Sequence, residues 1–385
     1  MRATVVSWLL APLALVVVAS AGCKRLASGS GLPGALPSGA VLVTAAPLPP
    51  PAPLPPPLPG AGAPSSFADL AARADPAVVF VKTIQEVRGI SGHRRVVGEG
   101  VGTAFVFDPN GLIITNNHVI EDASDIRVIF GRKREVKAAV VGRDQHTDIA
   151  VLRVDEKGLP FLPLGDSNAV RVGDWVVAIG NPFALAHTVS AGILSAKGRT
   201  IQDVKGLDES GYYDFLQTDA SINPGNSGGP LLDMAGNAVG INTAIRRQAN
   251  SIGFAIPINM VKDLLPRLIA DGRVRRSAIA VQVASLLPED MARLKLSDEN
   301  GALVRVVVPG GPGDRAGLQP DDVILAFENE PVPGPERLRW IASLAGVGKQ
   351  VTLRVARGGR IFDLKVKLDE LAEQPSAPSG EEEGP

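Results

Sequence analysis

The chain has 385 residues, of which 45% are hydrophobic, and its 39 basic and 40 acidic side chains nearly balance. This length accommodates two or three domains with sizeable cores. The charge balance excludes a general attraction to nucleic acid or to an anionic membrane surface. Cys23 is the only cysteine, so no disulfide can form within the chain.

Residues 1–22 predict a targeting segment, because Arg2 gives a positive start and residues 5–18 are mostly apolar. Three outcomes for this segment remain open: cleavage by a signal peptidase, lipidation at Cys23, and retention as a membrane anchor. The small residues at 19–21 fit a signal-peptidase site, and the four residues that end at Cys23 resemble a bacterial lipobox in which serine replaces the usual aliphatic residue. The segment is also about as long as the 20 residues that an uncleaved membrane anchor needs. We favour lipidation of Cys23, because the only cysteine lies where a lipobox requires it.

Residues 23–66 predict an extended linker. The stretch 27–66 contains no charged residue and is rich in proline. Proline fixes φ and removes a backbone donor, so a polyproline II conformation with a rise of about 3.1 Å per residue is expected. We interpret the linker as a spacer that holds the following domain away from a membrane, with a PxxP ligand as the alternative.

Residues 67–272 predict one mainly β domain. After a short helix over 67–74, β-rich runs alternate with Gly, Asn, Asp or Pro. Two sets of six strands favour two antiparallel barrels over a single sandwich, and a helix over 258–272 that is closed by Gly272 follows them. The predicted strands are 77–84, 102–108, 112–116, 126–130, 136–142 and 149–154, then 175–180, 188–197, 214–219, 229–233, 238–245 and 252–257.

Residues 277–370 predict a separate α+β module, and residues 371–385 predict a disordered acidic tail. The module combines one helix with four strands. The predicted helix covers 334–345, and the predicted strands cover 302–308, 322–328, 350–357 and 361–368.

The stretch INPGNSGGPLL at 222–232 contains Ser227 in a G-x-S-x-G pattern. The nucleophile elbow of α/β-hydrolases has this pattern, but its acid and histidine follow the serine. No histidine follows Ser227, which excludes that class. The order His, Asp, Ser is that of the double-barrel proteases of the chymotrypsin type.

Two upstream residues complete this chemistry. His118 follows a buried strand, and Asp148 precedes the last strand of the first set. A neutral imidazole accepts the proton of a serine hydroxyl, while a carboxylate on its other nitrogen fixes the tautomer. His93 and His187 fall in surface loops. His146 is the serious rival, since on a strand it would project to the same side as Asp148 in the manner of a metal pair, but no third ligand is nearby. No metal site is therefore predicted.

The glycines around Ser227 have a physical role in this interpretation. The backbone amides of Gly225 and Ser227 must point toward one position to stabilise a developing oxyanion. Glycine permits the close approach and the unusual dihedral angles that this requires.

From residue 67 to about 272 the chain closely resembles the HtrA (Deg) family of serine proteases, through segments such as GLIITNNHVIEDA, VVGRDQHTDIAVLRV and DFLQTDASINPGNSGGPLLD. The resemblance implies His118 as general base, Asp148 as its orienting partner and Ser227 as nucleophile. It also implies an oxyanion loop and a primary specificity pocket, and therefore cleavage after small aliphatic residues. The oxyanion loop would be Gly225, Asn226 and Ser227, and the pocket would be lined by Ile222 and Ile245.

The resemblance further implies a cofactor-independent protease of the bacterial envelope that cleaves unfolded or damaged proteins as a trimer or a multiple of trimers. The loop 85–100 between the first two strands is short, which favours a simple trimer over larger cages. Phe67 lies where family members pack aromatic residues between protomers, with a core position on its helix as the alternative. Two other classes stay open, a holdase chaperone and a stress-sensing scaffold with little proteolysis.

Residues 277–368 resemble the PDZ domain of the same family, with GPGDRAGLQPDDVILAFENEPV as the marker. PDZ domains bind C-terminal peptides as an added strand. The segment Ile279-Ala280-Val281 stands where the family's carboxylate loop is expected. Ala280 replaces the usual glycine, which argues against tight carboxylate binding, and Asp321 stands where a turn glycine is common.

Overall fold

The computed structural model describes residues 64–371, apart from 89–93, 132–133, 181–187, 205–206, 209, 224, 244–251 and 297. The targeting segment, nearly all of the linker, Cys23, Ile245 and the acidic tail beyond residue 371 lie outside the described residues. Among the residues that are described, no helix is long and apolar enough to cross a bilayer.

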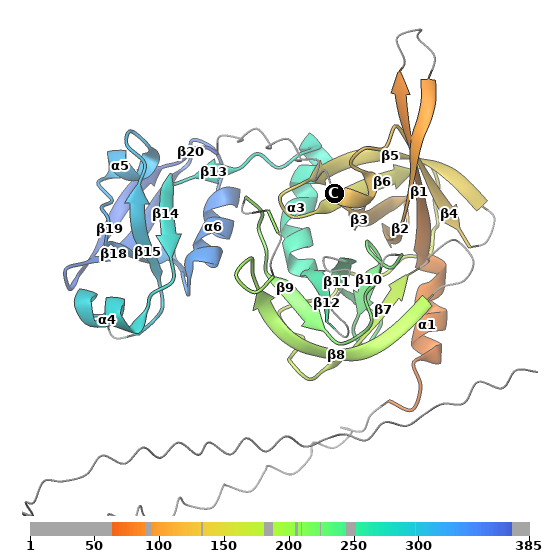
Figure 1. The fold of residues 1–385 in the computed structure, drawn as a ribbon, viewed down its shortest axis with the longest axis horizontal. Coiled ribbons are helices and arrows are strands. Elements are labelled where there is room, and N and C mark those ends of the chain that lie inside the picture. Colours follow the sequence, from red (N-terminus) through yellow and green to blue (C-terminus); the bar gives the residue numbers. More distant parts are fainter. Residues whose placement is uncertain are drawn as a thin grey trace, which may run out of the picture. The chain divides into compact units, whose positions relative to one another are not determined.

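The first six strands close into an antiparallel barrel in the order β1-β2-β3-β6-β5-β4 (Figure 1). Its core is formed by inward-facing apolar residues such as Val79, Ala104 and Leu152, which are fully buried. A helix and a 3-10 turn precede the barrel, and a one-turn helix follows β3. The elements are α1 (Ala68–Ala74), η1 (Asp75–Ala77), β1 (Val78–Arg88), β2 (Arg94–Asp108), β3 (Leu112–Asn116), α2 (Asn117–Ile120), β4 (Asp125–Phe130), β5 (Arg134–Asp144) and β6 (Ile149–Val154).

The next six strands close a second barrel in the order β10-β11-β12-β9-β8-β7. The helix α3 (Ile258–Asp271) follows and ends at Gly272, which has a φ of 71° and donates its N–H to the carbonyl of Leu268. This left-handed end needs glycine. The strands are β7 (Trp175–Gly180), β8 (Thr188–Arg199), β9 (Phe215–Thr218), β10 (Pro230–Leu232), β11 (Ala238–Thr243) and β12 (Gly253–Pro257). All the strands predicted for the two barrels are present, so the predicted fold is confirmed.

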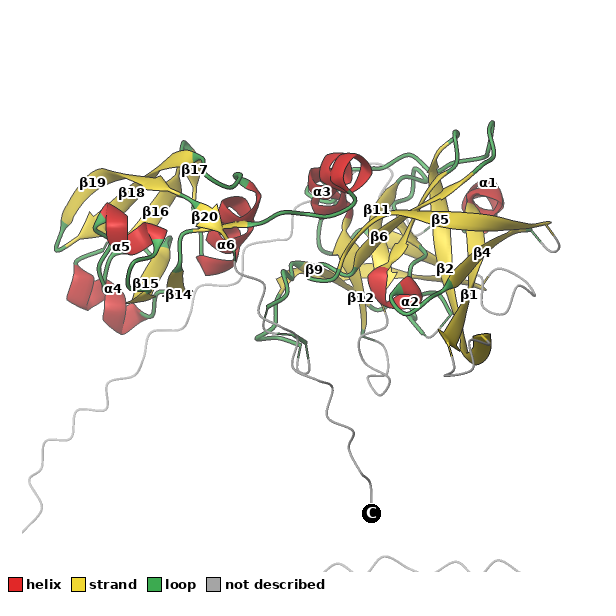
Figure 2. Ribbon diagram, turned by 90° about the horizontal axis from the view of Figure 1, so that it is seen from above, coloured by secondary structure: helices red, strands yellow, loops and turns green. Residues whose placement is uncertain are grey.

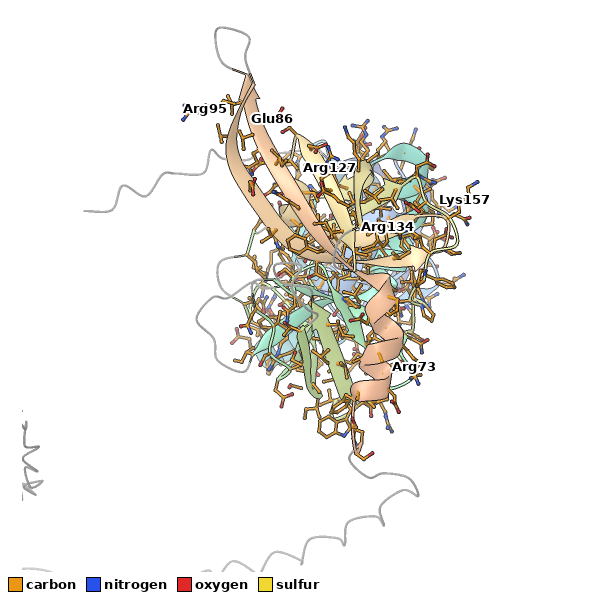
Figure 3. All side chains as sticks on the ribbon, turned by 90° about the vertical axis from the view of Figure 1, so that its right-hand side faces the viewer. Arg73, Glu86, Arg95, Arg127, Arg134 and Lys157 are labelled. Atoms are coloured by element: carbon orange, nitrogen blue, oxygen red, sulfur yellow. The ribbon has the colours of Figure 1, made fainter. Side chains whose placement is uncertain are left out.

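The prediction of a loop over 85–100 is wrong for most of that segment. β1 and β2 continue their pairing as far as Arg88 opposite Arg94, and the hairpin projects beyond the barrel (Figure 1). In Figure 3, Glu86 and Arg95 lie near its projecting end. The arm carries exposed valines, and its backbone hydrogen bonds are satisfied by the ladder itself. Without a buried face to give an apolar pattern, the sequence carries only a weak strand signal there.

The C-terminal module is built on a sheet with the order β14-β15-β16-β18-β19, and helices are few in both domains (Figure 2). The four predicted strands and the predicted helix are present, and the missed elements are all short. The elements are β13 (Ser277–Ala278), β14 (Val281–Ala284), α4 (Pro288–Leu294), β15 (Ala302–Val307), α5 (Pro312–Ala316), β16 (Val323–Phe327), β17 (Glu330–Pro331), α6 (Pro335–Leu344), β18 (Gln350–Arg357), β19 (Arg360–Lys367) and β20 (Asp369–Glu370).

A buried ion pair joins the first barrel to the start of this module. The two guanidinium nitrogens of Arg276 donate to the carboxylate oxygens of Asp144 at 2.7 and 2.6 Å, and both side chains are only 4% exposed. Thr147 donates a further hydrogen bond to Asp144. The bidentate geometry and the added donor satisfy most of the buried charge.

Candidate active site

The structure brings His118 and Asp148 together. Nδ1 of His118 lies 2.8 Å from one carboxylate oxygen of Asp148, and the backbone N–H of His118 donates to the other oxygen at 2.9 Å. Because Asp148 accepts at Nδ1, the neutral ring carries its proton there and leaves Nε2 as the basic nitrogen. The side chain of His118 is 44% exposed, so it remains accessible to a substrate.

The local chain conformation explains this contact. Residues 145–148 form a turn between β5 and β6, and Asp148 has a φ of 58°. Its carbonyl accepts the backbone N–H of Asn117 at 3.1 Å and the side-chain amide of Asn116 at 3.0 Å. Asp148 is thus held by both its main chain and its side chain against the start of α2.

The charges around His118 favour its protonated form. Burial lowers the pKa of His118, but the hydrogen bond to Asp148 and the negative charges of Asp148 and Glu121 outweigh it. The pKa therefore lies above its usual value of 6.5. A carboxylate that stabilises an imidazolium is what a general base needs at the moment it accepts a proton.

Ser227 lies on a tight turn held between the two barrels. Its carbonyl accepts the backbone N–H of Thr103 in β2 at 3.0 Å, while the N–H of the next residue, Gly228, donates to Asn242 in β11 at 2.9 Å. Gly228 has a φ of 83°, and a Cβ there would collide with the Thr103 carbonyl and the Thr115 hydroxyl. Only glycine fits at this position.

Asn226, in the middle of the predicted oxyanion loop, bonds to the residues that precede the loop. Its N–H donates to the carbonyl of Asn223 at 3.1 Å. Its side chain accepts from the N–H of Asn223 at 2.9 Å and donates to the carbonyl of Ser221 at 3.0 Å. Asn226 therefore fastens the preceding loop, which leaves the amides of Gly225 and Ser227 as the candidate oxyanion donors.

One of the two predicted pocket residues can be placed. Ile222 is partly buried and packs against the core of the second barrel. A Cβ on Gly253 would collide with the Ile222 side chain, so glycine at the start of β12 makes room for it. The second predicted wall, Ile245, lies outside the described residues.

His146 does not project beside Asp148, because the two residues lie in a turn and not on a strand. Its ring contacts Tyr212 edge-on, with centroids 6.3 Å apart, and its Nδ1 lies 3.3 Å from the hydroxyl of Ser210. Within the described part of the chain, no group of three or more His, Cys, Asp or Glu side chains could hold a metal.

The predicted carboxylate loop of the C-terminal module leads into β14, whose first residue is Val281. Ile279 is only 4% exposed and belongs to the core, and Val281 packs against the same cluster. Ala280 has a φ of 58°, where an L residue is strained. Asp321 also has a positive φ, of 72°, and its carboxylate is held by Arg293 at 2.7 and 2.9 Å.

Thr103, Thr115 and Asn242 support the Ser227 turn, but their sequence pattern indicates this role only weakly. Thr103 donates its hydroxyl to Gly225, 122 positions away, and no local pattern marks so distant a pair. All three are fully buried. Buried polar residues in an otherwise apolar strand were the one available hint.

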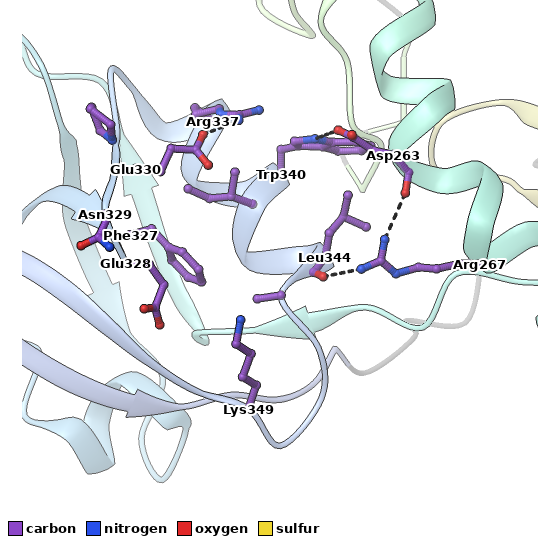
Figure 4. Close-up of a pocket in the computed structure, with 13 residues that line it drawn as sticks. Asp263, Arg267, Phe327, Glu328, Asn329, Glu330, Arg337, Trp340, Leu344 and Lys349 are labelled. Carbon is purple, nitrogen blue, oxygen red and sulfur yellow. Dashed lines mark hydrogen bonds and ion pairs between the residues drawn. The ribbon is translucent and has the colours of Figure 1, made fainter.

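A cavity of 760 Å³ lies elsewhere, between α3 and the α6–β17 side of the C-terminal module (Figure 4). It is lined by charged residues of both signs and by Trp340, whose Nε1 donates to Asp263 at 3.2 Å. His118, Asp148 and Ser227 do not line it, and we assign it no ligand.

Comparison with known proteins agrees with this architecture. A trypsin-like peptidase domain model matches residues 102–241, and a PDZ domain model matches residues 303–357. A "Probable periplasmic serine endoprotease DegP-like" from Chlamydia pneumoniae is 41% identical over 276 residues, which are 71% of this chain and 56% of that protein. The chain thus spans a little over half the length of this relative. The "Putative serine protease HhoA" of Synechocystis sp. is 40% identical, with 72% of each chain covered.

Solved structures give the same result. The HtrA-type protease AlgW with a tripeptide is 38% identical, with a TM-score of 0.70 and coverage of 80% of this chain and 98% of that one. The serine endoprotease from Yersinia pestis is 34% identical, with a TM-score of 0.59 and coverage of 81% and 100%. With two barrels, a PDZ domain and relatives matched at this identity along most of their length, the chain belongs to the HtrA family of serine proteases.

Proposed function

We propose that this protein is a serine endopeptidase of the bacterial cell envelope that degrades misfolded or damaged proteins. The proposal rests mainly on one observation. Asp148 holds His118 by both carboxylate oxygens, on the same barrel that holds the Ser227 turn through the N–H of Thr103. A base with a fixed tautomer and a serine on a rigid glycine-rich turn are the parts that acyl transfer requires.

In the proposed mechanism, each of these residues has one role. Nε2 of His118 takes the proton of the Ser227 hydroxyl as its oxygen attacks the substrate carbonyl, and Asp148 stabilises the resulting imidazolium. The amides of Gly225 and Ser227 stabilise the oxyanion, each by about 3 to 4 kcal/mol. The imidazolium then protonates the leaving amine, and water repeats the sequence to release the acyl group from Ser227. None of these steps calls on a metal or a cofactor.

The substrate preference and the assembly are part of the proposal. Ile222 and Ile245 as two β-branched walls would make a shallow apolar pocket for Val, Ala or similar residues.

Homologues named as periplasmic endoproteases support a periplasmic location, with Cys23 as a lipid anchor and the linker as a spacer. We expect a homotrimer in which Phe67 contributes to protomer contacts, although within one chain its ring packs on Trp175 at 5.5 Å. Binding of C-terminal peptides at the PDZ domain is expected to be weak because of Ala280.

A fluorophosphonate probe and casein degradation test the proposal on the full chain. We expect the probe to label the wild-type protein and casein to be cleaved, and we expect Ser227→Ala to abolish both. If the wild type prevents aggregation of an unfolded protein but neither reacts with the probe nor cleaves casein, the protein is a holdase and the proposal fails. Cleavage after large aromatic residues in the casein products would contradict the small pocket.

A further inference from the structure

Thr103 lies in β2 and makes several hydrogen bonds behind the Ser227 turn. Its hydroxyl donates to the carbonyl of Gly225 at 2.5 Å, and its N–H donates to the carbonyl of Ser227 at 3.0 Å. Its own carbonyl accepts the hydroxyl of Thr115 at 2.8 Å. Thr103 is fully buried, so water does not compete for these bonds.

The backbone bond and the hydroxyl bond do different things. Any residue except proline could donate its N–H to Ser227. Only serine or threonine at position 103 offers a short hydroxyl that reaches Gly225. The hydroxyl therefore adds something that the strand itself cannot supply, a fixed direction for the carbonyl of Gly225.

That direction matters because of the conformation of Gly225. Its φ of 113° lies in a region that is open mainly to glycine, where the backbone has freedom to rotate. The carbonyl of Gly225 begins the peptide that leads to Asn226, and the side chain of Asn226 bonds to Asn223 and Ser221, which precede that peptide. The hydroxyl of Thr103 thus holds the carbonyl side of the peptide between Gly225 and Asn226, whose N–H side is held by the carbonyl of Asn223. With that peptide fixed next to Gly225, mainly rotation about φ is left to the Gly225 N–H, one of the two proposed oxyanion donors.

Close packing makes the contact specific. A Cβ on Gly229 would lie 2.9 Å from Cγ2 of Thr103. The methyl group of Thr103 thus contacts the end of the turn while its hydroxyl holds the start. This contact fixes the rotamer of Thr103 and keeps the hydroxyl aimed at Gly225.

From these contacts we infer that Thr103 is a positioning residue for the oxyanion loop, which its hydroxyl holds in the conformation that binds the transition state. The inference rests on the proposed endopeptidase function. Removing an oxyanion donor lowers kcat by about 10²–10³. Loosening a donor that is still present should have a smaller effect.

Thr103→Val tests this, since valine keeps the shape and removes the hydroxyl. With a peptide p-nitroanilide that ends in valine, we expect kcat to fall about tenfold or more while KM changes less than about twofold, because the loop acts on the transition state. Thr103→Ser should retain kcat within about threefold, since it keeps the donor. Thr83→Val, at another buried threonine of the same barrel that is 3% exposed, is the matched control and should leave kcat unchanged.

The number of intact sites is counted by complete fluorophosphonate labelling, and kcat is expressed per labelled Ser227. A purely structural role would lower the thermal stability and the labelled fraction but leave kcat per labelled site at the wild-type value, which would overturn the inference. So would an equal loss of kcat in Thr103→Ser and Thr103→Val. If Thr103→Val does not fold, Thr103→Ala is measured in the same way. A fully active Ser227→Ala would instead contradict the proposed function, so the two failures are distinguishable.

Discussion

Asp148 in the protease domain and Ala280 in the PDZ domain have the same φ of 58°, which glycine adopts readily, Asn and Asp adopt occasionally, and alanine adopts only with strain. The surroundings of the two residues differ. The side chain of Asp148 accepts two hydrogen bonds from His118, and its carbonyl accepts two more from Asn116 and Asn117. Ala280 accepts one backbone bond, from Val308, and its methyl group cannot hydrogen-bond. Strain of about 1–3 kcal/mol is therefore compensated by the contacts of the side chain at Asp148 but not at Ala280.

The largest loss of activity is expected when the side-chain hydrogen bonds that offset the backbone strain at Asp148 are altered. In Asp148→Asn the amide cannot fix the productive tautomer of His118, so kcat should fall by about 10⁴ while the fold is retained. Steady-state hydrolysis of the peptide p-nitroanilide measures this, with exposed Asp155→Asn as the control. A loss of less than about tenfold would mean that the strain at Asp148 serves no catalytic purpose.

The pH dependence gives a second test of the same contact. The general base must be neutral, and burial of His118 is outweighed by the interactions with Asp148 and Glu121, which raise the pKa of His118 above its usual 6.5. The value of kcat/KM should therefore rise with pH to a midpoint above 6.5 and fall about tenfold per unit well below that midpoint. Asp148→Asn should move the midpoint to lower pH, since it removes the negative charge of Asp148 that raises the pKa of His118 and leaves only Glu121 to raise it. A wild-type midpoint below 6.5 would contradict this account.

The smallest effect is expected at Ala280. In Ala280→Gly the strain is relieved, but the unfolded chain gains entropy, so stability should rise by at most about 1 kcal/mol. Affinity for a C-terminal peptide should increase, because a glycine loop can approach the carboxylate more closely. Thermal denaturation and fluorescence anisotropy of a labelled peptide measure the two quantities. Equal peptide affinities in Ala280→Gly and wild type would show that residue 280 does not limit carboxylate binding.

The sequence predicts much of this because the relevant signals are local. Alternating apolar residues locate the strands of both barrels, and the order of His118, Asp148 and Ser227 excludes the α/β-hydrolase class. The projecting arm of β1 and β2 was missed because it has no buried face. The bond from Thr103 to Gly225 and the pairing of Asp144 with Arg276 join residues more than 100 positions apart, and such pairs depend on how strands pack and not on their pattern.

Because of the ion pair between Asp144 and Arg276, the protease domain and the PDZ domain are less independent than the sequence suggests. Asp144 ends β5 immediately before the turn that carries Asp148, whereas Arg276 belongs to the segment that leads into the PDZ domain. A chain cut after Gly272 would leave Asp144 buried with Thr147 as its remaining side-chain donor. Loss of one partner of a buried pair typically costs about 3–5 kcal/mol. Deleting the PDZ domain together with Arg276 would therefore destabilise the turn that carries Asp148, and any fall in activity on truncation would report folding as well as regulation.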